Sequence, residues 1–236
     1  RGKFRSRTKE SILEEARLLA ASGVKELIIV AQDITRYGID LYGKVCLTEL
    51  LKELCKLDFR WVRLHYLYPE LIDDELIDEI ASEDKIVKYL DIPIQHINDT
   101  ILRRMNRRGT GEEIRALFKK LRERIPGLVL RTSLITGLPG EGEAEFEELC
   151  DFLREAKIER AGVFPYSPEE GTPAALMPDR CSTEEAQRRA ELCMEIQAEI
   201  MDHFVSVLPA FELYPFQSAD ARDAIVSGLI ESGKID

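Results

Sequence analysis

The sequence predicts a parallel α/β fold. Short apolar runs rich in Ile, Leu and Val alternate with longer segments whose apolar residues recur every three or four positions. Polar and glycine-rich motifs follow the apolar runs, as in folds whose ligands bind beyond the carboxyl ends of parallel strands. The 236 residues, 44% of them hydrophobic, suffice for one barrel-sized domain. These patterns leave a (βα) barrel and a doubly wound sheet as alternatives.

The first half of the chain contains three predicted strands with their helices. A helix is expected over 8–22, where one face carries Ile12, Leu13, Ala16, Leu19 and Ala20 and where Gly23 provides the stop. The segment ELIIV over 26–30 is expected to be a buried strand. The following expected elements are a helix over 47–57, a strand over 61–68, a helix over 73–81 with aspartates at its start, and a strand over 86–94.

The second half continues the alternation. Thr110 and Glu113 have the spacing of a capping box for a helix that runs to 124, and Ser182 and Glu185 have it for a long helix that reaches about 204. Between them we expect a strand over 128–136, a helix over 143–156 and a strand over 161–166. The segment 204–236 changes character and remains an unassigned tail, which leaves 1–203 as the predicted core domain.

Composition excludes several classes of protein. The net charge of −11 argues against DNA binding, which needs clustered Lys and Arg. No apolar run approaches the roughly 20 residues of a membrane helix. The odd number of widely spaced cysteines favours neither a disulfide framework nor a metal site and indicates the cytoplasm; they are Cys46, Cys55, Cys150, Cys181 and Cys193. Since the sequence also lacks HExxH and nucleophile-elbow motifs, no metal ligands and no hydrolase are predicted.

The motifs after the predicted strands supply candidate binding residues, each with a structural alternative. Gln32 and Asp33 could contact a ligand or cap a turn. His96 could serve a site or be a hydrogen-bonded structural histidine. Arg131 lies within a predicted strand, so it either pairs with an acid or holds a ligand carboxylate.

Two further motifs carry the same ambiguity. The glycines of TGLPGE, over 136–141, suit a tight turn whose amides could approach an anion or a purine edge. Tyr166 could pack in the core or stack on an adenine.

Read together, four motifs resemble the radical S-adenosylmethionine (SAM) methylthiotransferases. They are VAQDITRYGIDLYG, DIPIQHIND with ILRRMNRRG, LRTSLITGLPGEGEAEFEEL and FPYSPEEGTPA, and they occur in the family's order over residues 1–203. The AQD and DIPxQH forms resemble the branch that adds a methylthio group to the β-carbon of an aspartate in a small-subunit ribosomal protein. The branch that modifies an adenosine of tRNA, which typically has GQN in place of AQD, is the alternative.

The resemblance implies a fold, a cofactor and its contacts. It implies a partial TIM-like barrel of about six parallel strands, of which this chain would hold the last five and lack the first. SAM would lie across the strand ends. By motif matching, Gln32 and Asp33 would contact its methionine end, Gln95 with Arg131 or Ser133 its ribose and carboxylate, and Ile135 to Gly137 with Phe164 and Tyr166 its adenine.

The resemblance also sets expectations that the sequence does not meet. The family holds a 4Fe-4S cluster on three thiolates of a CxxxCxxC loop, which does not occur here, and RGKFRSR resembles the stretch just after that loop. The tail does not resemble the family's C-terminal β-barrel domain. We therefore expect the chain to be inactive by itself, and a non-catalytic barrel remnant is a third hypothesis. The implied partners are a small-subunit ribosomal protein as substrate and the ribosome around it.

Overall fold

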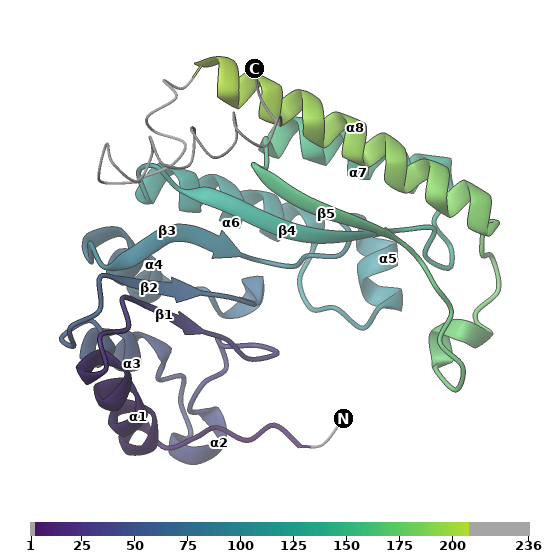
Figure 1. The fold of residues 1–236 in the computed structure, drawn as a ribbon. Helices are drawn as coiled ribbons and strands as arrows, with labels where there is room; N and C mark the ends of the chain where they lie inside the picture. The colour runs from purple at the N-terminus through teal and green to yellow at the C-terminus, as the bar shows by residue number, and fades with distance from the viewer. Residues whose placement is uncertain (1–2, 208–236) are drawn as a thin grey trace, which may run out of the picture. The chain divides into compact units, whose positions relative to one another are not determined.

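The computed structural model describes residues 3–207 and the side chains of residues 3–202. The chain divides into two units, Arg1–Ala198 and Glu199–Asp236, and the account below concerns the first. Five parallel strands form one sheet in sequence order (Figure 1); they are β1 (Glu26–Ile29), β2 (Trp61–Leu64), β3 (Ile86–Asp91), β4 (Val129–Thr136) and β5 (Arg160–Pro165). A doubly wound sheet reverses its strand order, whereas a barrel keeps it. The predicted partial barrel is therefore confirmed.

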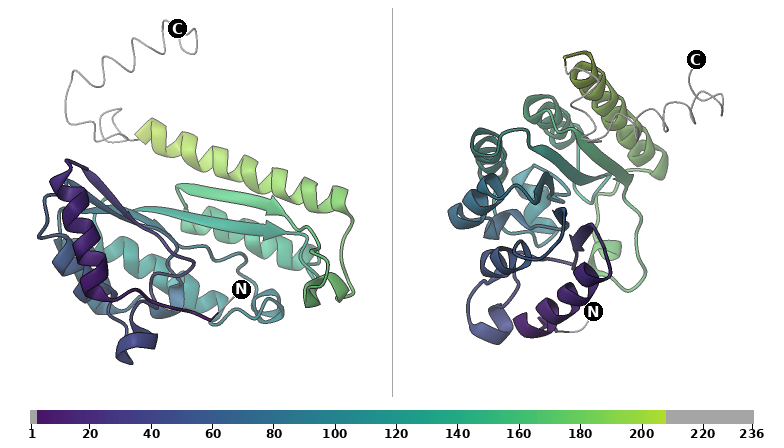
Figure 2. Two further views of the ribbon diagram at one scale, coloured as in Figure 1. Left: turned by 60° about the horizontal axis from the view of Figure 1, so that its bottom comes forward. Right: turned by 60° about the vertical axis from the view of Figure 1, so that its left-hand side comes forward.

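The helix before β1 and the helices that link the strands cover one face of the sheet. They lie side by side in chain order (Figure 2) and are α1 (Lys9–Ala21), α3 (Leu47–Leu54), α4 (Asp74–Ser82), α6 (Gly111–Arg124) and α7 (Glu143–Ala156). The long helix α8 (Thr183–Val207) follows β5. Shorter elements occupy the connections; they are α2 (Ile39–Tyr42), α5 (Asp99–Arg104) and the 3₁₀ helices Pro69–Leu71 and Pro173–Leu176. We call the sheet surface turned away from α1 to α7 the inner face.

The capping predictions are tested directly by hydrogen bonds. The Thr110 hydroxyl accepts from the Glu113 amide, and the Glu113 carboxylate accepts from the Thr110 amide, so this capping box is confirmed. The Ser182 hydroxyl accepts from the Glu185 amide at 3.1 Å. The Glu185 carboxylate, however, accepts from the guanidinium groups of Arg188 and Arg189 instead of closing the second box.

The strand predicted over 26–30 is present as β1, but the prediction that it is buried is wrong for the side chains on the inner face. Ile28 is 52% and Val30 is 61% exposed, because nothing in the described part of the chain covers that face and no described strand pairs with the free edge of β1. Ala16 is the only fully buried residue of the apolar face predicted for the first helix, because Ile12 and Leu19 line a cavity between α1 and β1. Such an edge offers unpaired backbone groups to another strand.

Two other strand predictions need correction, and one of them is the strand predicted over 86–94, which ends at Asp91. The strand predicted over 61–68 ends at Leu64, because Tyr66 takes a positive φ of 61° that breaks the extended backbone before the 3₁₀ helix begins. The tail predicted over 204–236 lies outside the described residues from 208 on, so the two domain ranges stay predictions.

Candidate functional site

The carboxyl ends of the parallel strands meet at one edge of the sheet. At the end of β1, the Asp33 carboxylate accepts from the Thr35 amide at 3.0 Å and from the Thr35 hydroxyl. The Thr35 side chain is fully buried, and its hydroxyl accepts in turn from the Tyr68 amide after β2. Asp33 therefore caps a turn that joins the ends of β1 and β2, while Gln32 beside it is exposed.

The segment after β3 runs along β4 instead of leaving the sheet. The Gln95 amide donates to the Ser133 carbonyl at 2.9 Å, and the Ile135 amide donates to the Gln95 carbonyl at 2.9 Å. The backbone of Gln95 takes a φ of 72°, which is rare for a residue with a side chain and costs of order 1–3 kcal/mol. Three predicted site residues are thus brought together, and strained backbone of this kind often marks a binding site.

The loop after β4 turns sharply at Gly137. Its φ is 75°, and a Cβ atom at this position would lie 2.4 Å from the Cβ atom of Ala186 in α8. The Gly137 amide donates to the Glu141 carboxylate at 2.9 Å. Arg104 of α5 donates to the Pro139 carbonyl at 3.2 Å from the other side. Only a glycine fits at 137, as the TGLPGE motif suggested.

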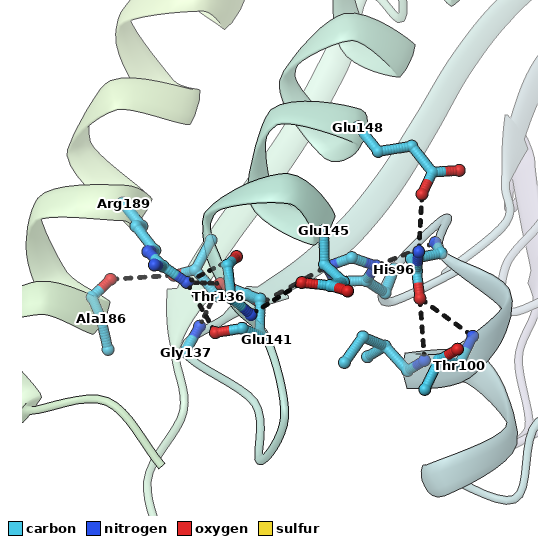
Figure 3. A network of polar contacts seen from close by, with 12 residues as sticks. His96, Thr100, Thr136, Gly137, Glu141, Glu145, Glu148, Ala186 and Arg189 are labelled. Atoms are coloured by element: carbon cyan, nitrogen blue, oxygen red, sulfur yellow. Dashed lines mark hydrogen bonds and ion pairs between the residues drawn. The ribbon is translucent and has the colours of Figure 1, made fainter. Parts of the chain in front are cut away.

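A buried carboxylate organises this loop (Figure 3). Glu141 Oε1 accepts from the Gly137 amide and from Arg189 Nη1, both at 2.9 Å, and its side chain is fully buried. Arg189 also donates to the Glu141 carbonyl and to Glu185 of its own helix. Burial by itself raises the pKa of Glu141, but its polar contacts with His96, Gly137 and Arg189 outweigh burial, so the pKa lies below its usual range.

His96 belongs to the same network and has a structural role. Its Nδ1 accepts from the Asn98 amide at 3.0 Å, which places the proton of the neutral ring on Nε2. Nε2 lies 3.4 Å from Glu141 Oε2, longer than an ordinary hydrogen bond. The ring is fully buried, so the hydrogen-bonded structural histidine is the alternative that the structure supports.

The end of β5 adds an aromatic wall. The Tyr166 amide donates to the Thr136 carbonyl at 2.8 Å, and the Tyr166 hydroxyl is buried without a hydrogen-bond partner among the described residues. A cavity of about 450 Å³ opens beside it; its lining includes Gly137, Met177, Asp179, Arg180 and Ala186. Phe164 is 54% exposed on the inner face. A second cavity of about 500 Å³ is mostly apolar and lies between α1 and β1, away from Gly137 and Tyr166.

The inner face carries a row of charged residues across the middle strands. Asp91 and Arg131 are register partners of β3 and β4, and Arg131 Nη1 donates to Asp91 Oδ1 at 2.7 Å. His65 Nδ1 lies 3.5 Å from Asp91 Oδ2. Ser133 and Ile135 follow on the same side of β4. Of the two alternatives for Arg131, the pairing with an acid is therefore present.

The cysteines are dispersed over the fold, and all five have free thiols. Cys150 of α7 and Cys193 of α8 are in contact through their thiols, a pairing that their spacing did not reveal. Within the part of the chain that the structure describes, no three His, Cys, Asp or Glu side chains lie close enough to hold a metal ion. No described helix has the length and apolar character needed to cross a membrane.

Known proteins resemble this chain in sequence and in fold. The sequence profile of the Radical SAM superfamily matches residues 1–153. The ribosomal protein uS12 methylthiotransferase RimO of Clostridium perfringens is 53% identical over 203 residues, which are 86% of this chain and 46% of that protein. The same enzyme of Clostridium botulinum is 53% identical over 201 residues, which are 85% and 45% of the two chains. The chain thus spans about half the length of the curated relatives it matches.

Two solved structures support the fold alone. Coproporphyrinogen III oxidase (HemN) of Escherichia coli, a radical SAM enzyme, aligns with a TM-score of 0.60 at 19% identity over 84% of this chain and 48% of that chain. SuiB of Streptococcus suis bound to S-adenosylmethionine aligns with a TM-score of 0.56 at 18% identity over 84% of this chain and 43% of that chain.

Proposed function

This chain belongs to the radical SAM superfamily, and we propose that it is the core of a methylthiotransferase that modifies an aspartate of ribosomal protein uS12. The observation that carries the proposal is the 53% identity to uS12 methylthiotransferases over 86% of the chain. A cytoplasmic location, beside ribosomes, follows from the proposed substrate.

We propose that SAM binds across the strand ends. A zwitterionic methionine group needs polar partners of both kinds in a water-poor site, and an adenine needs a flat apolar wall with polar edges. The half-buried Ser133, the glycine turn at 137 and the unpartnered hydroxyl of Tyr166 suit such a ligand. When bound and reduced, SAM supplies the radical chemistry that removes a hydrogen atom from an unreactive carbon.

The proposed contacts keep the order that the motifs imply. Gln32 and Asp33 would face the methionine end, although the Asp33 carboxylate already caps its turn. Gln95 and Ser133 would face the ribose, and their backbones are hydrogen-bonded to each other. The adenine would lie against the remaining residues of the set, which are Ile135, Gly137, Phe164 and Tyr166. Arg131 receives a different assignment below.

The described residues do not fit an iron–sulfur cluster. Three thiolates must converge on one cluster, whereas Cys46 and Cys55 flank α3, Cys150 lies in α7, and Cys193 lies in α8. The residues around the loop after β4 would bind and orient SAM. Glu141 and Arg189 fix the turn at Gly137, and Arg104 donates to the same loop at Pro139.

A chimeric enzyme tests the proposal. The matching segment of the Clostridium perfringens relative is replaced by residues 1–203 of this chain, so that the relative supplies everything outside the match. The purified chimera, with reconstituted clusters, reductant, sulfide and SAM, is incubated with uS12, with uS12 whose acceptor aspartate is asparagine, and with tRNA.

We expect mass spectrometry to find a methylthio group on uS12 only when the aspartate is present. A folded chimera that binds SAM but leaves uS12 unmodified, beside an active parent enzyme, would contradict the proposal. Methylthiolation of tRNA in place of uS12 would support the tRNA-modifying alternative.

A further inference from the structure

Arg131 on the inner face of β4 uses only a small part of its hydrogen-bonding capacity. A guanidinium has five N–H donors, and Asp91 is the only hydrogen-bond partner of Arg131 among the described residues. Arg63 on β2 also donates to one acid, Glu26, but its guanidinium stacks over the Tyr89 ring with a Cζ-to-centroid distance of 5.4 Å. Arg131 therefore keeps donors that face the open side of the sheet, where 28% of its side chain is exposed.

Asp91 fixes the direction of the Arg131 fork. Its side chain is only 2% exposed, with one oxygen on Arg131 and the other 3.5 Å from His65 Nδ1. Burial lowers the pKa of Arg131, but the bond to Asp91 outweighs burial and raises it, so the guanidinium stays charged at any working pH. Because Asp91 accepts from Nη1 alone, the N–H groups of Nη2 and Nε remain available to a second acid.

The space in front of the fork is kept open by a glycine. Arg131 Nη2 lies 3.8 Å from where a Cβ atom of Gly162 would be, and the Phe164 ring lies 3.4 Å from the same point. Phe164 is 54% exposed. Because residue 162 is a glycine, it places no side chain between the Arg131 guanidinium and the Phe164 ring. A carboxylate fits this space, because a guanidinium can bind both of its oxygens at once.

We propose that Arg131, oriented by Asp91, binds the side-chain carboxylate of the aspartate that is modified. The inference rests on the proposed function and names a specificity determinant for its acceptor. The same chemistry has a second source, the carboxylate of the methionine part of SAM, and the SAM measurement in the test below distinguishes the two sources.

The geometry of the proposed reaction points the same way. The β-carbon of the acceptor must face the cofactor at the strand ends, so its carboxylate points away from the cofactor and toward the interior of the inner face. The row of Asp91 and Arg131 lies there. An asparagine in place of the aspartate has no charge and one oxygen, and the loss of a charge-assisted bond weakens binding roughly ten- to hundredfold.

The test measures three ligands on three variants of the 236-residue chain. The ligands are a synthetic peptide with the acceptor aspartate of uS12 and its flanking residues, the same peptide with asparagine, and SAM. The variants are Arg131→Gln, Arg131→Lys, and Arg154→Gln as a control that removes an exposed arginine from the outer helix α7. Calorimetry gives affinities, and the Gly162 amide signal in NMR spectra reports binding beside the fork.

We expect the wild type and the control to prefer the aspartate peptide roughly ten- to hundredfold, with a shift of the Gly162 signal. Arg131→Gln should abolish the preference, Arg131→Lys should restore part of it, and both should leave SAM affinity unchanged. A wild type that does not distinguish the peptides, or an Arg131→Gln variant that loses SAM affinity, would overturn the assignment.

The chimera separates this inference from the proposed function. If the chimera modifies uS12, Arg131→Gln in the chimera should raise the KM for uS12 far more than it lowers kcat; an unchanged KM would overturn the inference alone. If the chimera does not modify uS12 while the chain still selects the aspartate peptide through Arg131, the proposed function fails and the carboxylate site stands.

Discussion

Replacing Glu141 by Gln should destabilise the chain strongly, although the two side chains have nearly the same shape. The change removes the charge that faces Arg189, whose side chain is 6% exposed, and it places an amide where one oxygen accepts two hydrogen bonds. Leaving one member of a buried ion pair without its partner costs 3–5 kcal/mol in typical cases. Arg189 keeps Glu185 and Glu143, so we expect a loss of about 2–4 kcal/mol and a Tm lower by roughly 5–15 °C.

Glu143→Gln is the matched control. Glu143 contacts the same arginine at 3.3 Å, but its side chain is 62% exposed, so water screens the pair and the loss should stay below about 1 kcal/mol. Urea unfolding followed by the fluorescence of Trp61, the only tryptophan, measures both variants. Equal losses for the two variants would refute the reasoning that burial makes Glu141 the critical partner.

The pH dependence of the Glu141→Gln loss follows from the direction of the Glu141 pKa. The folded-state pKa of Glu141 lies below its usual range, so its charge contributes stability above the unfolded pKa and this contribution is lost as the pH falls through the folded pKa. The difference between wild type and Glu141→Gln should therefore be full near pH 7 and should shrink as the pH falls below about 4. A difference that grows on acidification would contradict the direction.

Three further predictions concern the glycine turn, a buried thiol and the cofactor. Gly137→Ala should lower the free energy of unfolding by several kcal/mol, because its Cβ atom would meet Ala186. Gly127→Ala has a φ of 71° and open space around it, so backbone strain should lower the free energy of unfolding by only about 1 kcal/mol. Urea titrations compare the two variants. Burial raises the pKa of the Cys55 thiol to about 12, so at pH 8 iodoacetamide should leave Cys55 unmodified in the folded chain and label it in urea, as mass spectrometry would show. SAM should bind the 236-residue chain roughly 100-fold more weakly than the chimera in calorimetric titrations, because a cluster on the relative's part of the chimera would give SAM a further charged binding partner. Equal affinities would contradict this reasoning.

The sequence predicted the elements well where a single local signal decides them. Thr110 and Glu113 marked the start of α6 correctly, since both capping bonds lie within four residues. α5 was missed although Asn98 caps it, because six helical residues are too few to show a period. The exposure of Ile28 was missed because an apolar run does not tell whether both faces of a strand are covered.

The site was predictable as a set of strand ends but not as a network. The motif placed Gly137 and Glu141 in one turn, yet nothing in the spacing of the sequence links Glu141 to Arg189, which lies 48 residues later. An acid partner was one of the two alternatives for Arg131, and identifying it as Asp91 requires the register of β3 against β4. Register and long-range pairing are properties of the folded sheet, and a single sequence carries only weak traces of them.

Helix α8 explains why the site depends on residues beyond the matched superfamily segment, which ends at 153. In a parallel βα fold the loops at the carboxyl ends of the strands project into water, and each is fixed only by its own strand and helix. Here α8 follows the last strand and contacts the loop after β4, with the Thr136 hydroxyl donating to the Ala186 carbonyl at 2.9 Å and Arg189 reaching Glu141. Further along the same helix, Gln197 donates to the carbonyl of Ile158 at 2.9 Å, just before β5 begins. One helix is thus anchored at both ends of the sheet, so the glycine turn at 137 is held by a rigid element, and a ligand at the strand ends meets amides that are already in place.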